Sequence, residues 1–137
     1  IRMNTENYPT WLVPLDIAKE LKDIGFDTPC SFYYDEKLLK ISPWHDEEFA
    51  VTNWNDELFH YCVSLPTWEQ VFQWFRGKGM FHSISIVNDL LEEVKYFETE
   101  ICDNNGDIIC IISRVTYEEA REELVKTLIR TYKNEQL

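Results

Sequence analysis

An Asn-Gly pair between two runs of strand-forming residues constrains the fold of this chain most. The first run spans Val94 to Cys102, the turn is Asp103-Asn104-Asn105-Gly106-Asp107, and the second run spans Ile108 to Ser113. Asn-Gly supplies the positive backbone angles that a tight hairpin needs, so the two runs are predicted to pair antiparallel. The segment Ile108 to Ile112 is apolar on both faces of a strand, which indicates a central position in the sheet.

Two helices flank this region and begin with the same capping signature. Thr67 is followed by Gln70, and Thr116 by Glu119, so each pair can satisfy two backbone N–H groups at a helix start. Between them, Met80 to Asn88 alternates as a strand does. The C-terminal half is therefore predicted to run helix, strand, strand, strand, helix, with the last helix over Thr116 to Tyr132.

The N-terminal half adds one helix and further strands. An apolar stripe at helical spacing predicts a helix over Pro14 to Ile24, which Gly25 would end. Alternating runs predict three strands in this half, Cys30 to Tyr34, Leu38 to Ser42 and Leu58 to Ser64. The chain is thus predicted to be α+β, with an antiparallel sheet of about four to five strands and three helices packed against it.

Length and composition favour one domain. The chain has 137 residues, 45% of them hydrophobic, which is enough for one core and short for two ordinary domains. A single domain over residues 1–137 is the prediction, with residues 1–10 flexible and residues 43–57 a long loop that is functional or disordered. Met3 is interpreted as the natural start of the chain.

The charge and the cysteines limit the partners and the compartment. The net charge is -12, and both halves of the chain are acidic, so no basic cluster is available to neutralise the phosphates of a nucleic acid. No apolar run is long enough for a membrane helix, and the N-terminus lacks signal-peptide features. The four cysteines lack metal-binding spacing. Free, buried thiols and a cytoplasmic location are predicted.

One group of residues has the side chains of a hydrolytic site. His45 and Asp46 lie in the long loop, and His60 and Cys62 follow it two residues apart on a predicted strand. A histidine beside a cysteine can generate a thiolate, and two histidines with a carboxylate can hold a zinc ion and its water. Adjacent loop residues rarely converge on one ion, so a solvated acidic loop is favoured over a metal site, and no cofactor is expected. A small hydrolase remains the alternative function.

Aromatic residues support the leading hypothesis, a non-enzymatic interaction module with a protein partner. On a helical wheel, Trp68, Val71, Phe72 and Phe75 share one apolar third and are predicted to be core. Trp74 lies at the edge of that stripe. Tryptophan anchors many interfaces, so the candidate binding residues are Trp74 and the loop residues Trp44 and Trp54. An exposed apolar stripe would equally support a homodimer.

Three segments of the chain together resemble a known family. They are Leu21 to Cys30, Leu65 to Val71 with Trp74-Phe75-Arg76, and Thr116 to Arg121. In this order they resemble a family of small uncharacterised proteins encoded in prophages and other mobile elements of gut bacteria. The resemblance implies an accessory protein of a mobile element, and it implies no catalytic or binding residue.

The predicted order of the C-terminal half also resembles the double-stranded-RNA-binding domain. That resemblance covers topology alone. Where that family has basic residues at the start of its last helix, this chain has Glu118, Glu119, Glu122 and Glu123. Because these carboxylates would repel phosphates, the RNA-binding function is rejected.

Overall fold

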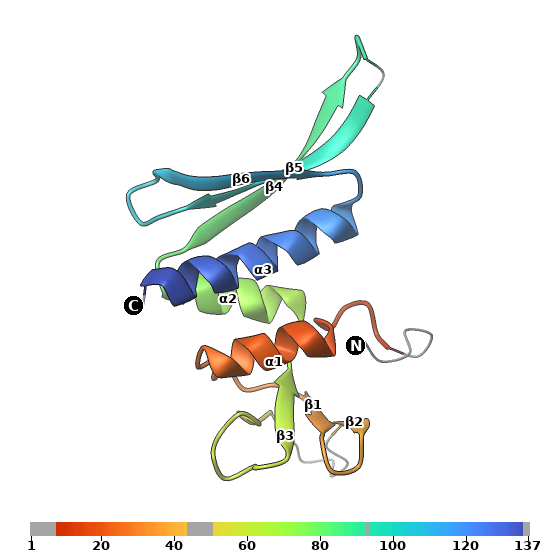
Figure 1. Ribbon diagram of the computed structural model, residues 1–137, viewed down its shortest axis with the longest axis vertical. Helices are drawn as coiled ribbons and strands as arrows, with labels where there is room; N and C mark the ends of the chain where they lie inside the picture. Colours follow the sequence, from red (N-terminus) through yellow and green to blue (C-terminus); the bar gives the residue numbers. More distant parts are fainter. Residues whose placement is uncertain (1–7, 44–50, 93, 136–137) are drawn as a thin grey trace. The chain divides into compact units, whose positions relative to one another are not determined.

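The computed structural model describes residues 8–43, 51–92 and 94–135. They form three helices and two three-stranded antiparallel sheets, which confirms the predicted α+β class and the number of helices (Figure 1). The chain divides into two compact units, Ile1–Val71 and Phe72–Leu137. The expectation of a single domain stays a prediction.

The first unit combines one helix with a sheet of short strands. Its elements are α1 (Leu15–Asp23), β1 (Phe32–Asp35), β2 (Lys40–Pro43) and β3 (Cys62–Leu65). The strand order is β2-β1-β3, and α1 packs on β3.

Helix α1 ends where the sequence predicts, because Gly25 adopts a φ of 95° that favours glycine. The buried face of α1 carries Ile17, Ala18 and Leu21.

Helix α2 (Trp68–Gly77) belongs to both units, since the division falls between Val71 and Phe72. Its predicted capping box is present: the Thr67 N–H donates to Gln70 Oε1 at 2.8 Å, and the Gln70 N–H donates to Thr67 Oγ1 at 3.2 Å. The four residues predicted to form its core face are all buried, namely Trp68, Val71, Phe72 and Phe75.

The second unit is built on three longer strands and one long helix. Its elements are β4 (Phe81–Asp89), β5 (Val94–Cys102), β6 (Ile108–Arg114) and α3 (Tyr117–Glu135). The predicted hairpin is present, with β5 paired antiparallel to β6 across a turn in which Gly106 has a φ of 82°. The predicted order of the C-terminal half, helix, three strands and helix, agrees with the structure.

The position predicted for Ile108 to Ile112 is wrong. The order in the second sheet is β4-β5-β6, so β6 is an edge strand and β5 is central. The physical reason is that β4 pairs with β5 over its whole length and not with β6. Strand β5 therefore has a neighbour on each side, and β6 has one on one side only. Apolar residues on both faces of β6 therefore do not reflect burial on both faces.

The strands form two sheets instead of one sheet of four to five strands. Each unit completes its own hydrogen-bonded ladder, with β1 between β2 and β3 and β5 between β4 and β6. After β3, Pro66 and the capping box lead directly into α2, so the chain leaves the first ladder before β4 begins. Hydrophobic periodicity finds individual strands, but it does not determine which strands share a ladder.

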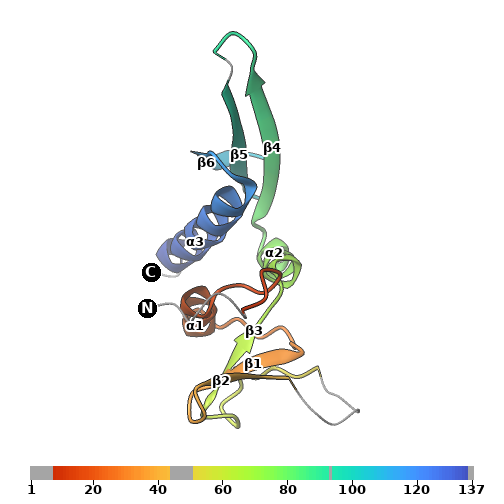
Figure 2. The same ribbon diagram turned by 90° about the vertical axis from the view of Figure 1, so that its right-hand side faces the viewer.

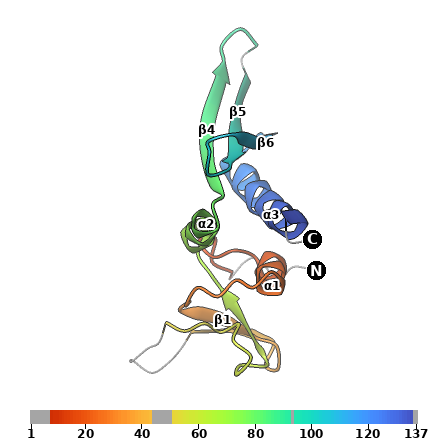
Figure 3. The same ribbon diagram turned by 90° about the vertical axis from the view of Figure 1, so that its left-hand side faces the viewer.

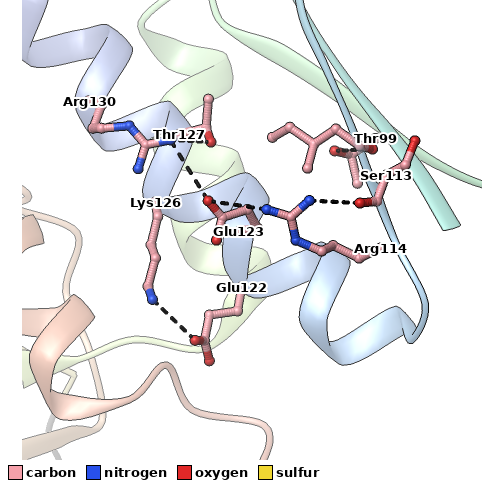
Figure 4. A network of polar contacts seen from close by, with 9 residues as sticks. Thr99, Ser113, Arg114, Glu122, Glu123, Lys126, Thr127 and Arg130 are labelled. Atoms are coloured by element: carbon pink, nitrogen blue, oxygen red, sulfur yellow. Dashed lines mark hydrogen bonds and ion pairs between the residues drawn. The ribbon is translucent and has the colours of Figure 1, made fainter.

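Helix α3 covers one face of the second sheet. It contacts β5 and β6, and on this face Thr99 and Ile101 are fully buried. Figure 4 shows the polar contacts at one side of this packing, where the Glu123 carboxylate of α3 lies 3.7 Å from the Arg114 guanidinium of β6 and 3.8 Å from Arg130. Strand register places the side chains of Ser83, Glu100 and Ile111 together on the other face, called the outer face here.

Candidate interaction surface

The structure describes two of the four residues of the proposed hydrolytic group, His60 and Cys62. His45 and Asp46, together with Trp44, lie outside the described residues. His60 lies in a turn and is exposed, because β3 begins only at Cys62 and is shorter than the predicted strand. The His60 ring lies 6.3 Å from the ring of Tyr61. Within the part of the chain that the structure describes, no three His, Cys, Asp or Glu side chains are grouped as metal ligands would be.

The surroundings of Cys62 oppose thiolate formation. Burial raises the pKa of its thiol above the ordinary value of 9.0, and the Asp35 carboxylate raises it further, whereas the Lys22 ammonium acts in the opposite direction. Lys22 instead donates a hydrogen bond to the Cys62 backbone carbonyl at 2.8 Å. A thiol with a raised pKa is protonated at neutral pH and is a poor nucleophile.

Trp54, predicted to bind a partner, is a core residue. Its side chain is 3% exposed, and its ring lies 4.3 Å from that of Tyr33 and 5.0 Å from that of Phe59. The indole N–H donates to the Cys30 carbonyl at 2.8 Å, and the Trp54 backbone N–H donates to Ser64 Oγ at 3.0 Å. The end of the long loop is thus fixed to the first sheet, and this indole offers almost no surface to a partner.

Trp74, the third predicted binding residue, is 9% exposed. Its ring meets the rings of Phe75 and Tyr132 edge to face, at 5.1 and 5.3 Å, and the Lys78 ammonium lies 4.9 Å from its centre. The sequence places Trp74 at the edge of the apolar stripe, but Tyr132 from α3 extends the covered area over it. The burial of Trp74 leaves little of the side chain for an interface.

The exposed apolar residues of the second unit lie elsewhere, and one group is on a projecting hairpin. Strand β6 pairs with β5 only over Phe97–Cys102. Between Phe97 and the start of β5 at Val94, the β4–β5 hairpin therefore continues as a two-stranded ribbon (Figures 1 and 2). In this ribbon Val87 faces Tyr96 and Asn88 faces Lys95. We call residues 87–92 and 94–96 the arm. Figure 3 shows the arm extending past β6 from the opposite side.

Two leucines form the tip of the arm. Leu90 is 82% exposed and Leu91 is 96% exposed. The Asp89 carboxylate organises the turn, because its Oδ1 accepts hydrogen bonds from the N–H groups of Leu91 at 3.0 Å and Glu92 at 3.3 Å. The tip therefore presents two apolar side chains beside the carboxylates of Asp89 and Glu92.

A second apolar group lies on and beside the edge strand β6. Three isoleucines are exposed there by 55%, 41% and 54%, in the order Ile108, Ile109 and Ile111. Phe81 of β4 is 39% exposed and shares the outer face with Cys102, which is paired with Ile108. Serines and glutamates occupy the outer face between these residues and the arm, since Ser83 pairs with Glu100 and Ser85 with Glu98.

Sequence reasoning missed both groups, although a signal for one of them is present. Leu90 and Leu91 stand in a bend between two strands, where turn-forming polar residues are usual. Adjacent leucines at such a position indicate an exposed apolar tip. For β6 no comparable signal exists, because an apolar strand at an edge and one at the centre of a sheet have the same sequence pattern.

Comparisons with protein-family models, with curated proteins and with solved structures found no match. The resemblance to a mobile-element family therefore stays a prediction. Among the described residues, none of the helices is both long and apolar enough to cross a membrane. The four cysteines are free thiols, but burial is as predicted for Cys30 alone, since Cys62, Cys102 and Cys110 are partly exposed.

Proposed function

We propose that this chain is a non-enzymatic protein-interaction module that binds its partner through the tip of the arm. The observation that supports the proposal is the pair of almost fully exposed leucines, Leu90 and Leu91, at the end of a two-stranded projection. Single exposed leucines are common on protein surfaces, but two adjacent ones on a projecting turn form a contiguous apolar knob.

The hydrogen bonds of the tip favour binding. Asp89 accepts from the N–H groups of Leu91 and Glu92, and the strands beside the tip are paired residue by residue. A binding element that is preorganised loses less conformational entropy when it associates, so more of the apolar burial appears as affinity. The arm can enter a cavity without the body of the second sheet having to rearrange.

Charge defines the kind of partner. The carboxylates of Asp89 and Glu92 lie beside the leucines, and the whole chain carries a net charge of -12. Complementary charge speeds association and excludes partners of the wrong sign. We therefore propose that the partner is a protein with an apolar pocket bordered by lysine or arginine. As an accessory protein of a mobile element, the chain would find this partner in the cytoplasm.

The proposal is tested by capture with a tip variant, Leu90→Ser/Leu91→Ser, and a matched control, Leu38→Ser/Leu58→Ser. The control replaces two leucines of the first unit that are also well exposed. Each protein is immobilised and incubated with lysate of the cell that encodes it. A protein retained by the wild type and the control, but lost with the tip variant, is then purified and its affinity for all three is measured.

We expect the tip variant to bind the purified partner at least about tenfold more weakly, equivalent to 1.4 kcal/mol or more, whereas the control retains wild-type affinity. Equal affinity of the tip variant and the wild type would exclude the arm as the contact. The hydrolase alternative gains no support from the described residues, since His60 is exposed in a turn and the pKa of Cys62 is raised.

A further inference from the structure

We propose that two copies of this chain pair antiparallel through the β6 edge, joining their three-stranded sheets into one continuous sheet. This inference concerns β6 and does not rest on the function proposed for the arm. Among the described strands, β6 has β5 as its one neighbour, so its other edge pairs with none of them. A free edge presents backbone N–H and C=O groups that another strand can pair with.

The middle of β6 lacks the features that usually protect a sheet edge. Natural edges carry lysine, proline, inward charges or bulges that prevent pairing with another chain. The run from Ile109 to Ser113 contains no charge and no proline. The register shift of the ladder falls at Ile109, between the partners of Ile101 and Cys102, and the pairing from Cys110 to Arg114 is regular. The edge is therefore suited to pairing over most of its length.

The apolar side chains give this pairing a driving force. Ile111 is more than half exposed on the outer face, and Ile108 and Ile109 extend the exposed area toward the start of the strand. Pairing two β6 strands would cover these side chains with those of the other copy, which removes apolar surface from water. The opposite edge, β4, offers less, because Ser83 and Ser85 interrupt its outer face.

Charge complementarity selects a second copy in antiparallel orientation. Strand β6 is flanked by an acid, Asp107, at one end and carries a base, Arg114, at the other. Centred on Ile111, an antiparallel pair sets Ile111 opposite its counterpart and brings each Asp107 beside the Arg114 end of the other copy. A parallel pair would instead place like charges together, which is unfavourable across neighbouring strands.

Arg114 can contact both Glu123 of its own chain and a carboxylate of a second copy. Figure 4 shows its Nη1 donating to the Ser113 carbonyl, at 2.7 Å, and its guanidinium directed toward Glu123 of α3. The side chain remains 42% exposed. The Glu123 contact, at 3.7 Å, holds the guanidinium at the end of β6, where a carboxylate from an antiparallel neighbour would arrive.

The inference is tested with the full chain by sedimentation velocity at protein concentrations from about 5 to 200 μM. We expect the wild type to shift from monomer to dimer as its concentration rises. Ile111→Lys introduces a charge at the centre of the pairing and should remain a monomer throughout. Ile86→Lys is the matched control, because Ile86 lies on the other edge strand and is exposed by 59% against 54% for Ile111. It should dimerise as the wild type does.

A second variant separates a loss of the dimer from a loss of folding. In Asp107→Arg, the hydrogen bonds of the turn are retained, since they use the backbone N–H and C=O of this residue. We expect its dimer to dissociate at least about tenfold more readily than that of the wild type. A wild type that is monomeric at every concentration would overturn the inference, and so would dimers of Ile111→Lys and Asp107→Arg as stable as the wild-type dimer.

The orientation is tested by disulfide trapping. In the antiparallel register centred on Ile111, Ile111→Cys places two thiols opposite each other, whereas Ser113→Cys places each thiol opposite Ile109 of the other copy. Only thiols whose Cα atoms lie within about 7 Å can join without backbone movement. Under a mild oxidant, Ile111→Cys should form covalent dimers well above the wild-type background and Ser113→Cys should not. Equal trapping of both variants would indicate parallel pairing and overturn the proposed orientation.

Discussion

At the scale of single residues, Cys30 is held in the first unit by hydrogen bonds of both its backbone and its thiol. Its backbone exchanges two with Thr52, at 2.8 and 3.1 Å, and its carbonyl also accepts from the Trp54 indole. The thiol donates to the Thr28 carbonyl at 3.3 Å. Burial raises the pKa of this thiol from 9.0 to about 12, although a hydrogen bond with Ser64 acts in the opposite direction.

The raised pKa of Cys30 predicts a loss of stability in alkali. Below pH 9 the thiol keeps its proton in the folded and the unfolded chain, so it contributes no pH dependence. Above pH 9 the unfolded chain releases this proton and the folded chain retains it until about pH 12. The free energy of unfolding should therefore fall as pH rises through this window, by up to about 1.4 kcal/mol per pH unit from this group.

Urea unfolding of the wild type and of Cys30→Ala measures this contribution. At about pH 7.5 the free energy of unfolding of the variant should be lower than that of the wild type by about 1 kcal/mol, because a buried side chain has been shortened. Near pH 10.5 the wild type should have lost up to about 2 kcal/mol through this thiol, more than the deficit of the variant, which has no thiol here to ionise when it unfolds, so the order should reverse and the variant should be the more stable. A difference that stays constant between the two pH values would contradict the raised pKa.

At the scale of elements, sequence reasoning succeeded where the determining interactions are local. Both capping boxes are present, and the Asn-Gly turn joins β5 to β6, because each depends on residues within a few positions of one another. The edge position of β6 depends on β4 reaching β5 from elsewhere in the chain. Local pattern does not contain that information, which is why Ile111 was expected inside the sheet and lies exposed.

The start of α3 provides a test of this local chemistry. The Glu119 N–H donates to Thr116 Oγ1 at 3.1 Å, and the Thr116 N–H donates to Glu119 Oε1 at 3.2 Å. Thr116 is exposed, so its replacement disturbs the cap and little packing. Thr116→Ala should lower the free energy of unfolding by about 1 kcal/mol, because one N–H at the helix start loses its acceptor.

Thr116→Ser is the control for that change. Serine keeps the hydroxyl that accepts from Glu119 and is at least as good a capping residue as threonine, so this variant should match the wild type in its urea midpoint. Should serine destabilise the protein as much as alanine, the loss would come from the methyl group of Thr116, and the capping interpretation would be wrong.

At the scale of the whole molecule, the candidate binding residues illustrate what burial adds to a sequence pattern. The helical period correctly separates the core face of α2 from its polar face, but Trp74 is covered by Tyr132, a residue 58 positions later. Trp54 is covered in the same way by Tyr33 and Phe59 around it. Aromatic content predicted an interaction surface at the tryptophans, whereas Trp54 and Trp74 are buried and the leucines of the arm and the isoleucines of β6 are exposed.

Net charge is a property of the whole chain, and it predicts how stability responds to salt. Twenty-five acidic residues against thirteen basic ones give -12, so the folded chain repels itself. The described ion pairs are partly exposed and 3.4 to 3.9 Å long. Each such pair contributes at most about 1 kcal/mol. Because charges of one sign are in large excess, we expect the net repulsion to exceed such attractions, so screening should stabilise the protein.

We therefore expect the urea midpoint at neutral pH to rise as NaCl increases from about 10 to 200 mM, a range over which the screening length falls from roughly 30 Å to less than 10 Å. The matched control is the same titration near pH 5, close to the isoelectric point of 4.6, where the net charge is small and the effect of salt should shrink. A midpoint that falls with salt at neutral pH would mean that the ion pairs, such as Glu123 with Arg114 and Arg130, contribute more than the repulsion does.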